Sequence, residues 1–103
     1  MIVISVMYPA TSGSRFDLDY YTKKHVPLVQ QRCKDLGLEH IQILRGVASL
    51  DGGTPAFQIT AMLTFTSTGE FQNAMAKHGG EIIADIPNFT SVQPILQVNE
   101  PLA

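Results

Sequence analysis

The chain has few of the residues that would tie it to disulfides, membranes or nucleic acid. Its one cysteine excludes an internal disulfide and is typical of a reducing compartment, so we expect a cytoplasmic protein. No stretch approaches the roughly 18 apolar residues that a membrane helix requires, and the apolar start of the chain lacks the basic flank of a secretion signal. Seven Lys and Arg residues against nine Asp and Glu residues form no basic stripe, so we expect neither nucleic acid nor a membrane as partner.

Charge is scarce as well. Only 16% of the residues are charged, against about 25% in typical soluble domains, while 45% are hydrophobic. A length of 103 residues fits one domain, and we expect residues 1–103 to form it. A domain this small with so few charges is expected to cover part of its surface with another subunit.

The hydrophobic pattern predicts six elements in the order β-α-β-β-α-β. Phe57 to Phe65 is the clearest, because apolar residues alternate with polar ones there, which indicates a strand with one buried face. Glycine and proline clusters separate the elements. The other expected strands are Ile2–Tyr8, Glu39–Leu50 and Phe89–Val98, and the expected helices start at Asp17 and Ser67 and end near Leu36 and Gly79.

This order predicts an α+β fold of the ferredoxin-like type, a four-stranded antiparallel sheet with both helices on one face. The other face of the third strand would carry Gln58, Thr60, Met62 and Thr64. Such a surface is too apolar to stay bare and too polar for a dry core. Two sheets closing face to face into a dimeric α+β barrel would cover it, and we expect a homodimer.

The first helix carries the most distinctive local signals. Asp17 is placed as its N-cap, and Phe16 and Tyr21 have the spacing of a hydrophobic staple around that cap. Pro27 lies about ten residues inside the helix, where it removes one backbone hydrogen bond, so we expect a kink just after His25. Gly79 and the glycine after it are expected to end the second helix, with a turn and a loop following.

His25 and His78 are the candidate proton-transfer residues. His25 lies four residues after Tyr21, so the two side chains share one helix face, and an imidazole there could move protons near neutral pH. The competing interpretation is a core histidine that hydrogen-bonds a carbonyl or Tyr21. His78 ends the apolar stripe of the second helix and could face the same pocket, or it could simply cap the helix C-terminus.

The remaining candidates are aromatic or sulfur-containing residues that could bind a substrate. Tyr21 is the better candidate for a ligand hydrogen bond, whereas Tyr20 points elsewhere and is expected at the rim or in the subunit contact. The others, which as individual residues are most simply core residues, would line any pocket between the helices and the sheet: Tyr8, Phe16, Phe71, Met75 and Phe89.

Several sharper motifs are missing. His25, His40 and His78 share no metal-ligand spacing, so we expect neither a metal site nor a cofactor. Cys33 has no helix N-terminus or fixed cation beside it and is expected to be buried and inert. The third strand lacks the basic and aromatic surface of RNA-recognition domains, which share this element order.

Two segments carry a family resemblance. F-D-x-D-Y-Y-x-x-x-H-x-P-L, Phe16 to Leu28, resembles the signature of the EthD-like family of small dimeric α+β barrel proteins. D-I-P-N-F-T-S-V-Q-P, Asp85 to Pro94, is similar to the final loop and strand of that family. Together they bracket most of the chain. The resemblance implies the same dimer, and an oxidoreductase or accessory role in degrading or making small compounds.

Three functions remain open at this stage. The first is a cofactor-independent enzyme acting on a small apolar or aromatic compound, either a monooxygenase-like oxidoreductase or a proton-transfer cyclase or isomerase. His25 would be its acid or base, Tyr21 would orient the substrate or His25, and His78 would be the second proton-transfer group. The second is a non-catalytic carrier or accessory protein for such ligands. The third is a structural dimer without a ligand.

Overall fold

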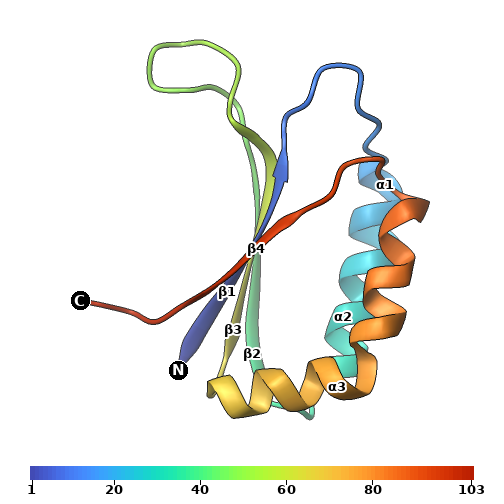
Figure 1. Cartoon of the computed structure of the whole chain (residues 1–103), viewed down its shortest axis with the longest axis vertical. Helices are drawn as coiled ribbons and strands as arrows, with labels where there is room; N and C mark the ends of the chain where they lie inside the picture. The colour runs from blue at the N-terminus through green and yellow to red at the C-terminus, as the bar shows by residue number, and fades with distance from the viewer.

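The computed structural model describes residues 1–103 as one antiparallel sheet covered on one face by two helical segments (Figure 1). The strands are β1 (Ile2–Pro9), β2 (Leu38–Arg45), β3 (Phe57–Phe65) and β4 (Ile95–Asn99), in the spatial order β2-β3-β1-β4. The helical elements are α1 (Leu18–Tyr20), the π-helical turn η1 (Tyr21–His25), α2 (Val26–Cys33), α3 (Thr68–Asp85) and the 3-10 turn η2 (Ile86–Asn88). This arrangement confirms the predicted ferredoxin-like βαββαβ fold.

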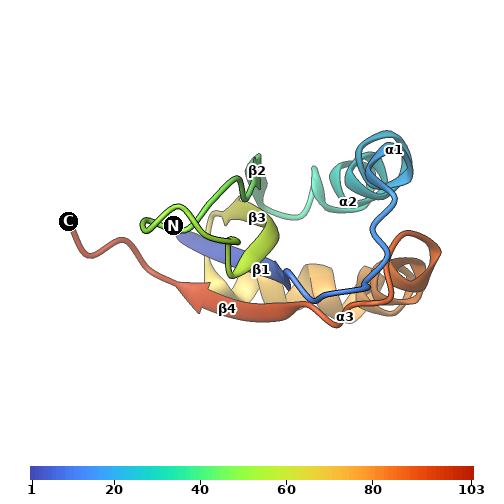
Figure 2. The same ribbon diagram turned by 90° about the horizontal axis from the view of Figure 1, so that it is seen from above.

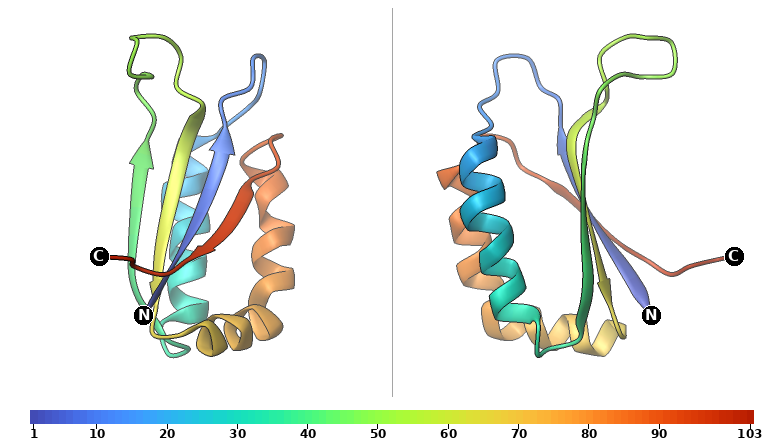
Figure 3. Two further views of the ribbon diagram at one scale, coloured as in Figure 1. Left: turned by 60° about the vertical axis from the view of Figure 1, so that its left-hand side comes forward. Right: turned by 180° about the vertical axis from the view of Figure 1, so that it is seen from behind.

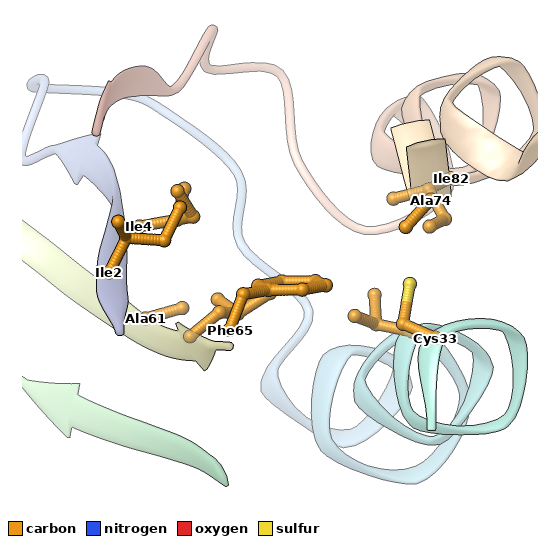
Figure 4. Packing of buried hydrophobic residues seen from close by; sticks show 9 residues of the cluster. Ile2, Ile4, Cys33, Ala61, Phe65, Ala74 and Ile82 are labelled. Carbon is orange, nitrogen blue, oxygen red and sulfur yellow. The ribbon is translucent and has the colours of Figure 1, made fainter. Parts of the chain in front are cut away.

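The alternation in β3 places its side chains as predicted. Ile59, Ala61 and Phe65 are buried on the helix side, and Ala61 lies opposite Val6 of β1 and Ile43 of β2. Burial of such apolar surface supplies the main stabilisation of the fold. In Figure 4 the ring of Phe65 reaches from the sheet towards Cys33 of α2, which is fully buried.

The other sheet face is left uncovered by the helices (Figure 2). It carries Met7, Leu44 and Met62, with Leu44 43% exposed. Polar residues of β3 lie between these apolar side chains, as the alternation predicts. The uncovered face is therefore mixed in polarity over its whole width.

Glycine meets close backbone contacts at the turns. A side chain at Gly46 would place its Cβ in a clash with the carbonyl oxygen of Phe57, so the two backbones approach too closely there for any residue but glycine. Gly37, just after the first helical segment, has φ +94°, a left-handed conformation that favours glycine. These positions allow the chain to turn from α2 into β2 and out of β2.

Three boundaries differ from the sequence prediction. The strand expected over Glu39–Leu50 ends at Arg45. The second helix does not end at Gly79 but runs on to Asp85. Figure 3 shows that its first half and its orange second half run in different directions, so the helix is bent. The last strand begins at Ile95, not at Phe89, because the preceding residues fold into η2 and pack Phe89 against the first helix.

No helix of the structure is both long and apolar enough to cross a membrane.

Candidate functional site

A cavity of about 240 Å³ lies between the sheet and the helical layer. Its wall is almost entirely apolar and includes Ile4 from β1, Leu63 from β3 and Phe71 from α3. Sites for drug-sized ligands usually measure about 300–1,000 Å³, so this one suits a compound of one or two rings. The lining residues whose side chains carry a nitrogen or an oxygen are Tyr8, Tyr21, His25 and Gln93.

The first helix places His25 on this wall. Asp17 caps the helix, its carboxylate accepting the backbone N–H of Tyr20 at 3.0 Å, and Phe16 packs edge-on against Tyr21 with ring centroids 5.3 Å apart. Both features confirm the predicted helix start. The ring of His25 is only 5% exposed, so it belongs to the interior.

Pro27 does not break this helix. His25 and Val26 both keep right-handed helical angles, and the backbone N–H of Val26 bonds the carbonyl of Tyr21, five residues back. The wider π-helical turn accommodates the proline, so the expected kink after His25 is replaced by this turn. Such turns are frequent at functional sites because they re-aim side chains.

Asp85 fixes the His25 ring. Nδ1 of His25 lies 2.9 Å from Oδ2 of Asp85, whose side chain is 13% exposed. Because a carboxylate accepts, the neutral ring carries its proton on Nδ1 and presents the lone pair of Nε2. Tyr20 and Asn88 donate to Oδ1 of Asp85 at 2.6 and 2.9 Å, so the carboxylate is held from three sides.

The electrostatics of Asp85 follow from these contacts. Burial raises the pKa of Asp85, but the hydrogen bonds from Tyr20, Asn88 and His25 outweigh it, so this pKa lies below its ordinary value of 3.8. Asp85 is therefore ionised at neutral pH. It holds a negative charge directly behind the imidazole.

Aromatic rings hold the imidazole from its other sides. Tyr21 stacks on His25 with ring centroids 5.7 Å apart, and Phe89 approaches to 4.5 Å. Phe89 is fully buried, and its carbonyl accepts the backbone N–H of Asp17 at 2.7 Å. The segment after α3 is thereby fastened to the start of the first helix, next to His25.

The structure brings five of the nine predicted site residues to the cavity wall. These are His25, Tyr21, Tyr8, Phe71 and Met75. The other three lie behind this wall: Phe16 packs against Tyr8, Phe89 against His25, and Tyr20 stacks on Phe89.

His78 is not brought to the cavity. His78 is half-buried on α3. Arg32 forms an ion pair with Glu81 at 2.8 Å and lowers the pKa of the Glu81 carboxyl, to which His78 adds a smaller effect. The expected approach of His25 and His78 assumed that α3 ends at Gly79. Because α3 bends and continues, its last residue, Asp85, reaches His25 instead.

Asp85 is the residue that sequence reasoning missed. It stands in the D-I-P-N segment that carries the family resemblance, but the segment was interpreted as a turn and a loop. An aspartate just before a proline turn was the available signal.

No group of three His, Cys, Asp or Glu side chains in the structure could hold a metal ion.

Similar proteins support the same fold and family. No protein-family model matches the chain. An 11.0 kDa protein from the thcB–thcC intergenic region of Rhodococcus erythropolis is 35% identical over 96 residues, covering 87% of this chain and 82% of that protein. An EthD-like protein from Ralstonia eutropha JMP134 is 38% identical with a TM-score of 0.91, over 99% of this chain and 92% of its own. An ethyl tert-butyl ether D (EthD) family protein from Bacillus halodurans C-125 has a TM-score of 0.77 at 20% identity, over 99% of both chains.

More distant structures share the fold alone. A dimeric ferredoxin-like protein from an uncultured marine organism has a TM-score of 0.66 at 11% identity, over 100% of this chain and 96% of its own. SnoaB from Streptomyces nogalater, a cofactor-independent oxygenase, has a TM-score of 0.62 at 10% identity, over 99% and 91%. The architecture places the protein in the ferredoxin-like class of α+β proteins that includes the dimeric α+β barrels. Within this class, the chain belongs to the EthD-like family, as its first and last motifs predicted.

Proposed function

We propose that the protein is an enzyme that moves a proton on a small apolar ring compound bound in the cavity, with His25 as general base. The observation that carries this proposal is the hydrogen bond from Nδ1 of His25 to Asp85 at the wall of that cavity. It leaves Nε2 as the only imidazole nitrogen able to accept a proton from a ligand. Asp85 acts as a positioning residue, because it sets the tautomer and stabilises the imidazolium that forms.

The chemistry suits an apolar substrate with one weakly acidic hydrogen. Nε2 takes that proton, and the substrate becomes an anion whose countercharge is the imidazolium next to Asp85. Such an anion is the reactive form of a phenol in oxygenation by O₂ and of a ketone in isomerisation or cyclisation. The likeness to SnoaB, named as a cofactor-independent oxygenase, supports the first of these reactions, and the apolar wall supports both.

The working form proposed here is a homodimer whose two sheets close face to face. The uncovered sheet face, with Met7, Leu44 and Met62 among polar neighbours, supports this assembly. The likeness to a dimeric ferredoxin-like protein supports it as well. Removal of this face from water would also shield the back of the sheet that floors the cavity.

The proton-transfer function is tested with β-tetralone, a small bicyclic ketone, in heavy water. NMR follows the replacement of its α-hydrogens by deuterium, which needs a base but no other reagent. Wild-type protein is expected to accelerate this exchange, and His25→Ala to lower the rate by about 100-fold or more while binding is retained. His40→Ala is the matched control, because His40 is exposed on β2 and should leave the rate unchanged.

Two results would contradict this proposal. Binding of the ketone without accelerated exchange would instead identify a non-catalytic carrier, the alternative function. An unchanged rate in His25→Ala would show that another group removes the proton.

A further inference from the structure

Two buried phenols at the cavity wall lack any partner for their hydroxyl groups. Tyr8 from β1 is 1% exposed and Tyr21 from η1 is 2% exposed, and their rings meet edge to face with centroids 5.9 Å apart. No hydrogen bond within the protein involves either hydroxyl. Yet no side-chain oxygen or nitrogen that is sealed inside the structure lacks a partner. Both hydroxyls therefore keep some accessible area, and both residues line the cavity.

The third tyrosine shows what a satisfied hydroxyl looks like here. Tyr20 donates to Asp85 at 2.6 Å, outside the cavity. Keeping a hydroxyl away from water without a partner is energetically costly, so most folds avoid it. Two such donors beside one imidazole point to a ligand oxygen as the missing acceptor.

We propose that the hydroxyls of Tyr8 and Tyr21 form a two-donor oxyanion site, and that the substrate is a small ring ketone or phenol whose oxygen they bind. This inference rests on the proposed function and names its substrate class. With a ketone, the C–H bond next to the carbonyl breaks and its proton goes to Nε2 of His25. The bonding pair forms the C=C bond of the enolate, the carbonyl pair moves onto oxygen, and the two phenols donate to that oxygen.

The acidity of both phenols fits the role of donors. Burial raises the pKa of Tyr21 to about 12, and burial together with the neighbouring Tyr21 also raises the pKa of Tyr8. Both hydroxyls therefore keep their protons at neutral pH. In the surrounding apolar wall, hydrogen bonds to a developing negative charge are stronger than in water.

An equilibrium measurement tests this site without any turnover. The probes are para-nitrophenolate, at a pH above the pKa of the free phenol, and para-nitroanisole, its neutral analogue of similar shape. We expect wild-type protein to prefer the phenolate, and Tyr8→Phe or Tyr21→Phe to lower this preference by about 10- to 100-fold each. The double variant should bind the two probes about equally, and binding of para-nitroanisole should be retained in all variants.

The result that overturns the oxyanion site is a phenolate preference that both phenylalanine variants keep. Failure of a wild-type preference overturns it equally. These results are separate from the exchange assay. If exchange depends on His25 but the phenylalanine variants keep the phenolate preference, His25 is the base and the oxyanion site is wrong. If the phenolate preference depends on the tyrosines but no exchange occurs, the two phenols bind the ligand oxygen and His25 is not a base.

Discussion

Nδ1 of His25 and Oδ2 of Asp85 lie 2.9 Å apart, which joins the first helix to the last residue of α3. The two residues are 60 positions apart in the chain. Their contact depends on the continuation of α3 past its two glycines and on the π-helical turn before Pro27. The proposed chemistry therefore depends on two irregular features of otherwise regular helices.

Replacement of Asp85 should lower catalysis without removing the ligand site. In Asp85→Asn the carboxylate that orders the ring is lost, so Nδ1 is no longer fixed as the donor and Nε2 as the base. We expect α-hydrogen exchange of β-tetralone to slow by at least about tenfold with an unchanged dissociation constant. An equal rate in the variant and the wild type would mean that Asp85 has only a structural role.

Asp85 should also make stability depend on pH in the acid range. Its pKa in the folded protein lies below the ordinary value of 3.8, so its contribution is complete above that value and is lost as the pH falls through the folded-state pKa. Urea unfolding at neutral pH should show Asp85→Ala destabilised by about 1–3 kcal/mol, because three donors lose their acceptor. The difference between variant and wild type should shrink below about pH 4, and a difference independent of pH would contradict this assignment.

Much of the architecture was predictable because it depends on local patterns. The alternation in β3 fixes which side chains face the helices, and Asp17 with Phe16 and Tyr21 fixes where the first helix starts. The pairing of His25 with Asp85 was not predictable in the same way. A glycine pair normally ends a helix, and only packing of Ile82 against the core shows that α3 continues. His78 was assigned to the cavity for the same reason, since the bend in α3 is a tertiary effect.

The three tyrosines should differ in their contribution to stability. Tyr8→Phe and Tyr21→Phe remove hydroxyls that bond nothing in the protein, so the free energy of unfolding should change by less than about 0.5 kcal/mol or rise. Tyr20→Phe removes a donor to Asp85 and should lower the melting temperature. Thermal unfolding followed by circular dichroism checks this order. A large loss in Tyr8→Phe would indicate that its hydroxyl has a partner within the protein.

The oligomeric state is checked by light scattering at micromolar concentration. A homodimer has twice the 11.3 kDa mass of one chain. Met62→Lys places a charge in the middle of the uncovered sheet face and should give the monomer mass, because burial of an unpaired charge is costly. Gln72→Lys, at an exposed position of α3, is the control and should leave the dimer intact. A monomeric mass for the wild-type protein would contradict the proposed dimeric barrel.

The most direct test of the account is the protonation of the two His25 nitrogens, measured by ¹⁵N NMR while para-nitrophenol is added. The chain has three histidines, so the His25 signals are assigned with His40→Ala and His78→Gln. We expect Nδ1 to carry a proton throughout, and Nε2 to change from an unprotonated to a protonated nitrogen as the phenol binds and its phenolate absorbance appears. A proton on Nε2 in the free protein, or an Nε2 signal that ignores the bound phenol, would contradict His25 as the base.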